Sequence, residues 1–204
     1  MVLLRIWSKE NKNEMNKLST LSLKELVSEI SERINAQPLV PDEVYALLTD
    51  LIPVVCIDCI PVDISNPLEP KIGVITRATG SQKGKKCLVG GRILKNESIS
   101  QAIRRHLMND LGVTQFTFFK INAEDKPFKV VCYKHADSAS DGKSFDPTKN
   151  AFSLTYLVSI SEEPVPHNEA LEFHWVSFVN EAVEDGFNQK TIMQQALEIL
   201  RNTP

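Results

Sequence analysis

The sequence predicts a mixed α/β sandwich preceded by a short helical extension. Short apolar, β-branched runs recur along the chain, an amphipathic helix interrupts them near the middle, and a second amphipathic helix closes the chain. With 204 residues, the chain has room for one domain of about 150 residues and an extension. We therefore place an N-terminal extension at residues 1–36 and a single domain at residues 37–204.

The composition is ordinary for a globular protein and argues against two classes of partner. Hydrophobic residues make up 42% of the chain, charged residues 24%, and the formal net charge is -3. Such a chain has no general basic field, so we expect no nucleic-acid partner. No apolar run approaches the ~20 residues of a membrane span and no secretory leader is recognised. We therefore expect a cytoplasmic protein without a membrane partner.

The extension contains one predicted amphipathic helix. Ser22 to Glu25 has the pattern of a capping box. Apolar residues at helical spacing follow, namely Leu23, Leu26, Val27, Ile30 and Ile34. Such a stripe needs a surface to pack on, which either the domain or a second subunit would supply. A homodimer is therefore one expected assembly.

In the first half of the domain we predict a short helix and three strands. The helix covers residues 42–51, between two prolines. Val54–Ile60 is an apolar, β-branched strand, and Ile72–Thr76 would pair with it as in a hairpin. Cys87–Val89 is a very short strand that leads into a tight turn at Gly90 and Gly91.

Beyond the central helix, apolar runs and turn residues define the remaining elements. We predict strands over residues 116–121, 128–133, 152–160 and 173–176, and a terminal helix over residues 188–200. A long polar loop covers residues 135–150, and an acidic loop covers residues 162–171.

Cys56 and Cys59 have the Cys-x-x-Cys spacing of zinc and redox sites. However, both lie in a predicted buried strand, where side chains three positions apart face opposite sides. The chain also lacks a second such pair. We therefore interpret these two cysteines as buried free thiols.

The central helix has a clear start, a clear end and a polar flank. Ile99, Ile103, Leu107 and Leu111 recur every fourth residue and form an apolar stripe. Ser98 is a predicted N-cap and Gly112 a predicted C-terminal stop. His106, Asn109 and Asp110 lie beside the stripe at i, i+3 and i+4, and this spacing places them on one helical flank.

This stretch resembles the Nudix box: Gly, five residues, Glu, seven residues, then Arg-Glu-apolar-any-Glu-Glu-any-Gly-apolar. The matching positions are Gly91, Glu97, Arg105, Leu107, Gly112 and Val113. His106, Asn109 and Asp110 occupy the positions of the glutamates, which carry a divalent metal in that family. The resemblance implies the Nudix fold, an α/β/α sandwich with a mixed sheet. It also implies that Glu97 pairs with Arg105 and holds the loop to the helix.

Between about Leu51 and Val176 the sequence is most similar to GDP-mannose mannosyl hydrolases. The shared features are Pro53 with the strand that contains Asp58, then Arg77, the Gly90-Gly91-Arg92 segment and Phe173-His174-Trp175. The resemblance implies a divalent-metal-dependent hydrolase of a nucleoside-diphosphate-linked substrate, specifically a nucleotide sugar. It implies Mg²⁺, with Mn²⁺ as the alternative, bound by the Gly90 carbonyl, Asp110 and Glu169.

The resemblance also implies roles for several charged residues. Arg77 and Arg92 would contact diphosphate oxygens, and Lys86, in a basic run, would extend the positive rim. Asp58 completes the charged set. The alternative for Arg77, Arg92 and Lys86 is that they are solvated surface residues.

The general base of the family falls on Ala170, which cannot accept a proton. His167 is a candidate substitute, and His106 is a second candidate that could bind metal or move protons. The alternatives are an ordinary loop histidine at position 167 and a packed polar residue at position 106.

A second interpretation is a catalytically silent Nudix module that binds a nucleotide or nucleotide sugar. His106, Asn109 and Ala170 favour it, because each replaces a chemically active residue of the family pattern. The retained charged set favours the enzyme, because a scaffold does not need it. A third interpretation is that the helix over residues 23–34 mediates dimerisation and that the protein acts through assembly.

Overall fold

The computed structural model describes residues 51–137, 142–180 and 183–203, and six earlier residues that are helical: Glu25, Ser28, Glu32, Tyr45, Leu48 and Thr49. The chain divides into two compact units, Met1–Leu51 and Ile52–Pro204. The two helices predicted before the first strand otherwise lie outside the described residues, and the boundary at residue 36 stays a prediction. Within the described part of the chain, no helix is both long and apolar enough to span a bilayer.

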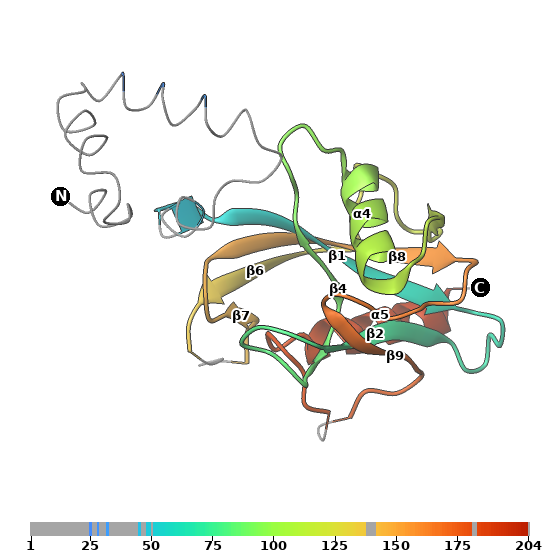
Figure 1. Cartoon of the computed structure of the whole chain (residues 1–204). Helices are drawn as coiled ribbons and strands as arrows, with labels where there is room; N and C mark the ends of the chain where they lie inside the picture. The colour runs from blue at the N-terminus through green and yellow to red at the C-terminus, as the bar shows by residue number, and fades with distance from the viewer. Residues whose placement is uncertain are drawn as a thin grey trace. The chain divides into compact units, whose positions relative to one another are not determined.

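Two long parallel strands form the centre of the sheet (Figure 1). β1 (Val54–Asp63) pairs with β8 (Ala151–Ile160) along almost its whole length. On its other edge β1 pairs first with β4 (Val89–Arg92) and then, at its end, with β2 (Lys71–Arg77). β1 therefore changes partner halfway along, and β4 and β2 diverge from each other.

The remaining strands extend the sheet from these central ones. β6 (Lys129–His135) and β5 (Phe116–Phe118) both pair with β8, at its start and its end respectively. β9 (Ala170–Val176) and β3 (Lys86–Cys87) are both antiparallel to β2. The short strand β7 (Phe145–Asp146) lies beside β6.

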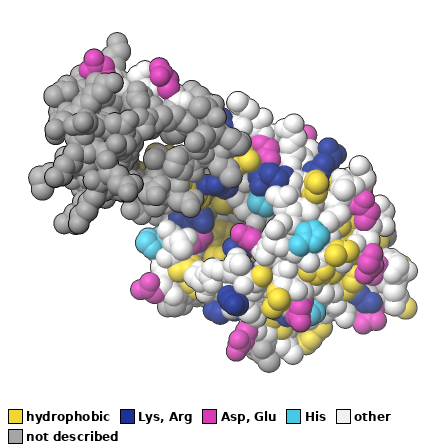
Figure 2. Space-filling view, in the orientation of Figure 1, with side chains coloured by type: hydrophobic (Ala, Val, Ile, Leu, Met, Phe, Trp, Pro, Cys, Tyr) yellow, Lys and Arg dark blue, Asp and Glu magenta, His cyan; other side chains and the backbone are white. Residues whose placement is uncertain are grey.

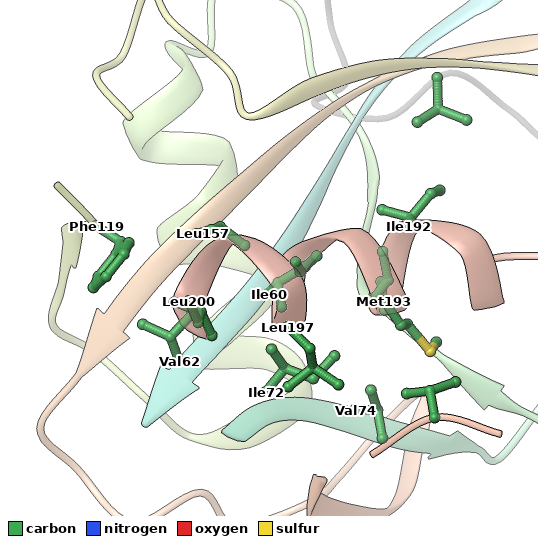
Figure 3. Packing of buried hydrophobic residues seen from close by; sticks show 14 of the residues in the cluster. Ile60, Val62, Ile72, Val74, Phe119, Leu157, Ile192, Met193, Leu197 and Leu200 are labelled. Atoms are coloured by element: carbon green, nitrogen blue, oxygen red, sulfur yellow. The ribbon is translucent and has the colours of Figure 1, made fainter. Parts of the chain in front are cut away.

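Among the described residues, one helix covers each face of the sheet. α4 (Ile99–Leu111) contributes Ile103, Leu107 and Leu111 to a core cluster that includes Ile57 and Cys59 of β1. α5 (Lys190–Asn202) packs on the opposite face, where Figure 3 shows its Ile192, Met193, Leu197 and Leu200 against Ile60, Val62 and Leu157. This arrangement confirms the predicted α/β/α sandwich with a mixed sheet.

Alternation along β1 also confirms the interpretation of Cys56 and Cys59. Cys56 belongs to the core cluster beneath α5, whereas Cys59 belongs to the cluster beneath α4. Both thiols are free and buried, and burial raises the pKa of Cys56 to about 12. Two side chains on opposite faces of one strand cannot share a metal ion.

The predicted turn at Gly90 and Gly91 is wrong, because both glycines lie inside strand β4. Neither has the positive φ that a tight glycine turn requires. Glycine is needed at these two positions because neighbouring atoms lie too close to leave room for a Cβ. A Cβ on Gly90 would lie 2.2 Å from the Ile57 carbonyl oxygen, and one on Gly91 would lie 2.7 Å from His106 Cε1.

The strand predicted over Cys87–Val89 is two strands with different partners. Cys87 belongs to β3 and pairs with β2, whereas Val89 belongs to β4 and pairs with β1. Between them, the Leu88 backbone N–H donates to Gln189 Oε1 (2.9 Å) instead of to a strand. The chain thereby passes from pairing with β2 to pairing with β1.

The other predicted elements differ from the structure only at their ends. β1, β2, β6, β8 and β9 are longer than predicted, and the loop predicted over residues 135–150 contains β7, a strand that was not predicted. β5 ends at Phe118 instead of residue 121, because the chain then turns and the Asn122 N–H donates to the Phe119 carbonyl (2.7 Å). Helix α5 begins and ends two residues later than predicted.

The two glycines of β4 yield a test of the close approach between β4 and its neighbours. We expect Gly90→Ala to lower the free energy of unfolding by at least about 2 kcal/mol, because a backbone oxygen blocks the methyl group. Gly91→Ala meets a side chain instead, so His106→Ala in the same chain should recover most of its loss. Urea denaturation measures both effects. Equal losses for the two alanine variants, without recovery, would contradict this account.

Candidate functional site

The central helix has the predicted caps. The Ser98 hydroxyl accepts from the Gln101 N–H (3.2 Å), and the Gln101 side chain accepts from the Ser98 N–H (2.8 Å), which completes a capping box. Gly112 adopts the left-handed conformation (φ 66°) and its N–H turns back to the carbonyls of the last turn. Local sequence thus fixes where the helix begins and ends.

Glu97 and Arg105 hold the preceding loop to this helix, as the resemblance implied. Arg105 donates to both oxygens of Glu97, from Nε to Oε1 (2.7 Å) and from Nη2 to Oε2 (2.8 Å). Arg105 Nη2 also donates to the Arg92 carbonyl (2.8 Å), and Glu97 Oε2 accepts from the Leu94 N–H (2.8 Å). One bidentate pair therefore joins the end of β4, the loop and α4.

His106 packs beneath β4. Its ring lies against Gly91, and its Nε2 is 3.3 Å from the Arg92 carbonyl oxygen, to which a protonated Nε2 donates. Burial lowers the pKa of His106 to about 4, so the ring is neutral at physiological pH. Asn109, in contrast, is exposed and Asp110 is buried. The three flank residues of the helix therefore occupy different environments.

The loop before β9 attaches to the C-terminal end of α4. The Val165 N–H donates to the Leu111 carbonyl (2.8 Å), and the His167 N–H donates to the Asp110 carbonyl (2.9 Å). The Asn168 side chain donates to the Asn109 carbonyl. These bonds satisfy helix carbonyls that have no partner within the helix. They also bring Glu169, next in the chain, to Asp110.

Asp110, Glu169 and Arg77 form a charged group that we call the Asp110 cluster. The Glu169 N–H points to Asp110 Oδ1 (3.4 Å), and Glu169 Oε2 pairs with Arg77 Nη2 (2.8 Å). Burial, and after it the charge of Glu169, raise the pKa of Asp110 to about 6, although Arg77 acts to lower it. The structure thus brings two predicted metal ligands together with one predicted phosphate ligand.

Asp58 lies in a second polar group close to Arg77. The Tyr133 hydroxyl donates to Asp58 Oδ2 (3.1 Å) and accepts from Gln189 Nε2 (2.9 Å). Burial raises the pKa of Asp58 to about 6, although Ser153, Tyr133 and the charge of Arg77 all act to lower it. The buried Ser153 hydroxyl has no hydrogen-bond partner of normal geometry within the described segments.

Arg77 lies between these two groups and rests on an aromatic ring. Its guanidinium carbon is 5.5 Å from the centroid of the Phe187 ring, and its Nε donates to the Thr79 carbonyl (3.2 Å). The Phe187 ring in turn meets Tyr133 edge to face, with centroids 6.3 Å apart. The charge of Arg77 lowers the pKa of both Asp58 and Asp110.

The other predicted site residues lie around this centre. Gly90 pairs with Asp58, and Arg92 pairs with Cys56, across the ladder between β1 and β4. The His167 ring lies against Gly112, and its charge lowers the pKa of Asp110.

The sequence predicted Lys86 beside the phosphate-binding arginines, but its side chain lies on the other face of the sheet from Arg77. Its Nζ donates to the Thr76 hydroxyl (2.7 Å), and this hydroxyl donates to Glu172 Oε2 (3.1 Å). Neighbouring residues of a strand point to opposite faces, so Thr76 and Lys86 lie on the other face of β2 from Arg77. On the face of the molecule in Figure 2, basic and acidic side chains are interspersed.

Sequence reasoning missed Tyr133, Phe187, Gln189 and Ser153. The inward position of Tyr133 follows from alternation along β6, so that signal was available. Gln189 and Phe187 lie in the connection before α5, and nothing in the local pattern relates them to residues 58 and 77. In the part of the chain that the structure describes, no group of three or more His, Cys, Asp or Glu side chains is placed so that it could hold a metal ion.

The fold and the Gly91–Glu97–Arg105–Gly112 frame are those of Nudix proteins, and solved structures of this class are similar to the chain. A possible asymmetric diadenosine tetraphosphate hydrolase from Jonesia denitrificans DSM 20603 is 27% identical, with a TM-score of 0.63 over 76% of this chain and 98% of that chain. A NUDIX-family hydrolase from Clostridium perfringens is 17% identical, with a TM-score of 0.52 over 73% and 99%. The fold of this chain is the Nudix fold.

A third similar structure is a bifunctional NMN adenylyltransferase/ADP ribose pyrophosphatase from Francisella tularensis, complexed with AMP and an Mn ion. It is 16% identical, with a TM-score of 0.51, and the match covers 95% of this chain and 55% of that one. By sequence, the chain belongs to the family described as a domain of unknown function, DUF4916, whose model matches residues 36–203. The comparison with curated proteins found no match.

The raised pKa of Asp58 predicts a distinct pH dependence of stability. The folded pKa of Asp58, about 6, lies above the ordinary aspartate value of 3.8, so the folded state binds a proton more tightly and wild-type stability falls as pH rises through this window. Asp58→Asn lacks the titrating group. Its stability relative to wild type should therefore increase between about pH 4 and pH 7, by up to about 3 kcal/mol.

Denaturation at several pH values measures the difference in free energy of unfolding between Asp58→Asn and wild type. The titration of Asp110 does not contribute to this difference, because both proteins contain Asp110. Asp63→Asn is the matched control. The Ser65 backbone bond lowers the pKa of Asp63, so its contribution has the opposite sign. A difference between Asp58→Asn and wild type that does not change with pH would contradict the assignment.

Proposed function

We propose that this chain is a divalent-metal-dependent hydrolase of a nucleoside-diphosphate-linked substrate, and that the substrate is a nucleotide sugar. The observation that carries the proposal is the Asp110 cluster. The Glu169 backbone is held beside Asp110, whose carboxylate is buried, and the charge of Glu169 raises the pKa of Asp110. Like charges held at close range are unfavourable unless a cation compensates them. A bound divalent cation would supply that compensation.

The donor set fits a magnesium site. Mg²⁺ is usually bound through one or two carboxylates, several waters and the phosphate oxygens of a substrate. Asp110 and Glu169 supply two carboxylates, and the resemblance adds the Gly90 carbonyl. A bound Mg²⁺ or Mn²⁺ would act as a Lewis acid on a phosphoryl oxygen. The similar protein from Francisella tularensis was solved with AMP and an Mn ion, which supports Mn²⁺ as the alternative.

Arg77 is arranged to receive a diphosphate. Glu169, the Thr79 carbonyl and the Phe187 ring hold its guanidinium beside both carboxylate groups. A guanidinium fixed before binding stabilises phosphate charge without reorganisation. The similar Jonesia denitrificans protein, a possible diadenosine tetraphosphate hydrolase, supports a nucleotide with linked phosphates. Arg92, at the end of β4, would be a second phosphate ligand.

The nucleotide-sugar part of the proposal rests on Asp58. Its buried carboxylate already accepts from Tyr133, and the Ser153 hydroxyl also lowers its pKa. Adjacent hydroxyl groups of a sugar would provide the donors that such a carboxylate accepts. His167 is the better placed of the two candidate bases, because its backbone N–H donates to the Asp110 carbonyl (2.9 Å) and holds the residue beside the Asp110 cluster. We assign His106 the role of fixing β4, since its ring is packed against Gly91.

A silent nucleotide-binding module is the second candidate function. It is favoured by the Nudix-box flank, where only Asp110 supplies a buried carboxylate while His106 is neutral and packed and Asn109 is exposed. Such a site could bind a nucleotide without enough metal ligands for turnover.

Product release from a panel of nucleotide sugars and nucleoside diphosphates, with and without Mg²⁺ or Mn²⁺, tests the enzyme. We expect metal-dependent turnover that falls roughly 100-fold or more in Asp110→Asn and in Glu169→Gln. Asn109→Ala, on the same helix turn but exposed, should retain wild-type activity. Saturable binding without turnover under either metal would overturn the enzyme and support the binding module.

A further inference from the structure

Two consecutive residues before α5 have a backbone conformation that side chains rarely adopt. Phe187 has a φ of 58° and Asn188 a φ of 54°. Asparagine tolerates the left-handed region, but for a bulky residue it is a genuine outlier. Such strain persists only where surrounding structure fixes it, and it concentrates at functional sites.

The segment around β7 fixes this strained pair. The Phe145 N–H donates to the Phe187 carbonyl (3.1 Å), and the Ser144 hydroxyl donates to the Asn188 carbonyl (3.2 Å). The Asn188 side chain donates to the carbonyls of Gly142 (2.7 Å) and Lys143 (3.1 Å). Several hydrogen bonds from one segment therefore maintain a conformation that the residues themselves disfavour.

The strain places the Phe187 ring where two halves of the site meet. One neighbour is the Arg77 guanidinium, and another is the edge-to-face Tyr133 ring. Phe187 also packs against both core clusters, the one beneath α4 and the one beneath α5. A residue with φ in an ordinary region would direct its side chain elsewhere.

We propose that Phe187 is a positioning residue for Arg77, and that the strained pair exists to hold its ring there. Arg77 has an ion pair with Glu169, but a cation at the Asp110 cluster would draw Glu169 away. The ring attracts the guanidinium through its face and occupies none of its N–H donors. Arg77 then stays in place with its donors available to an anion. The catalytic consequence rests on the proposed function; the positioning itself does not.

Side-chain NMR of ¹⁵N-labelled arginine tests the positioning without any activity. In wild type we expect a resolved Arg77 Nε–H signal, shifted by the aromatic ring and protected from exchange by the Thr79 carbonyl. Phe187→Tyr should keep this signal, whereas Phe187→Leu and Phe187→Ala should lose its shift and protection. The Arg105 signal, fixed by Glu97, is the internal control for folding.

The outcomes of this experiment are distinct. An Arg77 Nε–H that stays protected in Phe187→Leu overturns the proposal, whatever its shift, because loss of the ring alone removes the aromatic shift, and it leaves Phe187 as a packing residue. If Phe187→Ala also disturbs Arg105, the alanine variant has lost its fold and the leucine variant decides. Loss of the Arg77 signal in the leucine variant, with retention in the tyrosine variant, supports the positioning role.

Titration with inorganic pyrophosphate in the presence of Mg²⁺ separates this proposal from the proposed function. We expect Phe187→Leu to weaken binding about tenfold. If the ring acts through Arg77, Phe187→Leu/Arg77→Ala should bind no more weakly than Arg77→Ala alone. Additive losses would contradict the positioning role. If the NMR result holds while Arg77→Ala leaves pyrophosphate binding unchanged, the positioning stands and the diphosphate site of the proposed function falls.

Discussion

The candidate site depends on the hydrogen bonds between the last carbonyls of α4 and the loop before β9. A helix leaves its final carbonyls without partners, and water usually satisfies them. Here backbone N–H groups of Val165 and His167 do so. Asp110 would otherwise be a carboxylate at a helix C-terminus, where the helix dipole disfavours negative charge. The attached loop converts this position into a buried one beside Glu169 and Arg77, so the same bonds that cap the helix also assemble the charged cluster.

Arg77 sets the electrostatic balance of the site. Asp58 lies near it on one side and Asp110 and Glu169 on the other, so one guanidinium serves three carboxylates. Burial raises the pKa of both aspartates, and the charge of Arg77 reduces but does not cancel that effect. The centre therefore retains an excess of negative charge when all three carboxylates are ionised. Such a centre attracts a cation first, and only a centre already holding a cation would attract a phosphate group.

Local signals were sufficient where a single segment determines the structure. Ser98 and Gly112 mark the ends of α4 because capping involves only neighbouring residues, and alternation along β1 separates Cys56 from Cys59. The glycines of β4 were misinterpreted because a glycine pair indicates either a turn or a close approach. Only the position of the Ile57 carbonyl and the His106 ring decides between these.

The parts of the site that the sequence could not predict depend on contacts between distant segments. The pairing of Arg77 with Glu169 spans β2 and the loop before β9, and the family pattern suggested both residues without relating them. Phe187 has no sequence signal, because its role comes from a left-handed backbone held by the segment around β7. Ala170 packs in the core cluster beneath α4, so that position points inward and its alanine satisfies packing.

The replacement of a box glutamate by His106 has a consequence for how the proposed site would bind its ligands. A neutral imidazole, packed on Gly91, removes one negative charge from the flank of α4. Asp110 and Glu169 then supply two carboxylates, a number with which Mg²⁺ depends on substrate phosphate and water for its remaining ligands. Metal alone would be bound weakly, and phosphate alone would meet an excess of negative charge. Each would therefore increase the affinity for the other, as linkage requires when two ligands share one site. In this way the proposed site, with fewer carboxylates, would favour joint binding of metal and nucleotide over a permanently bound ion.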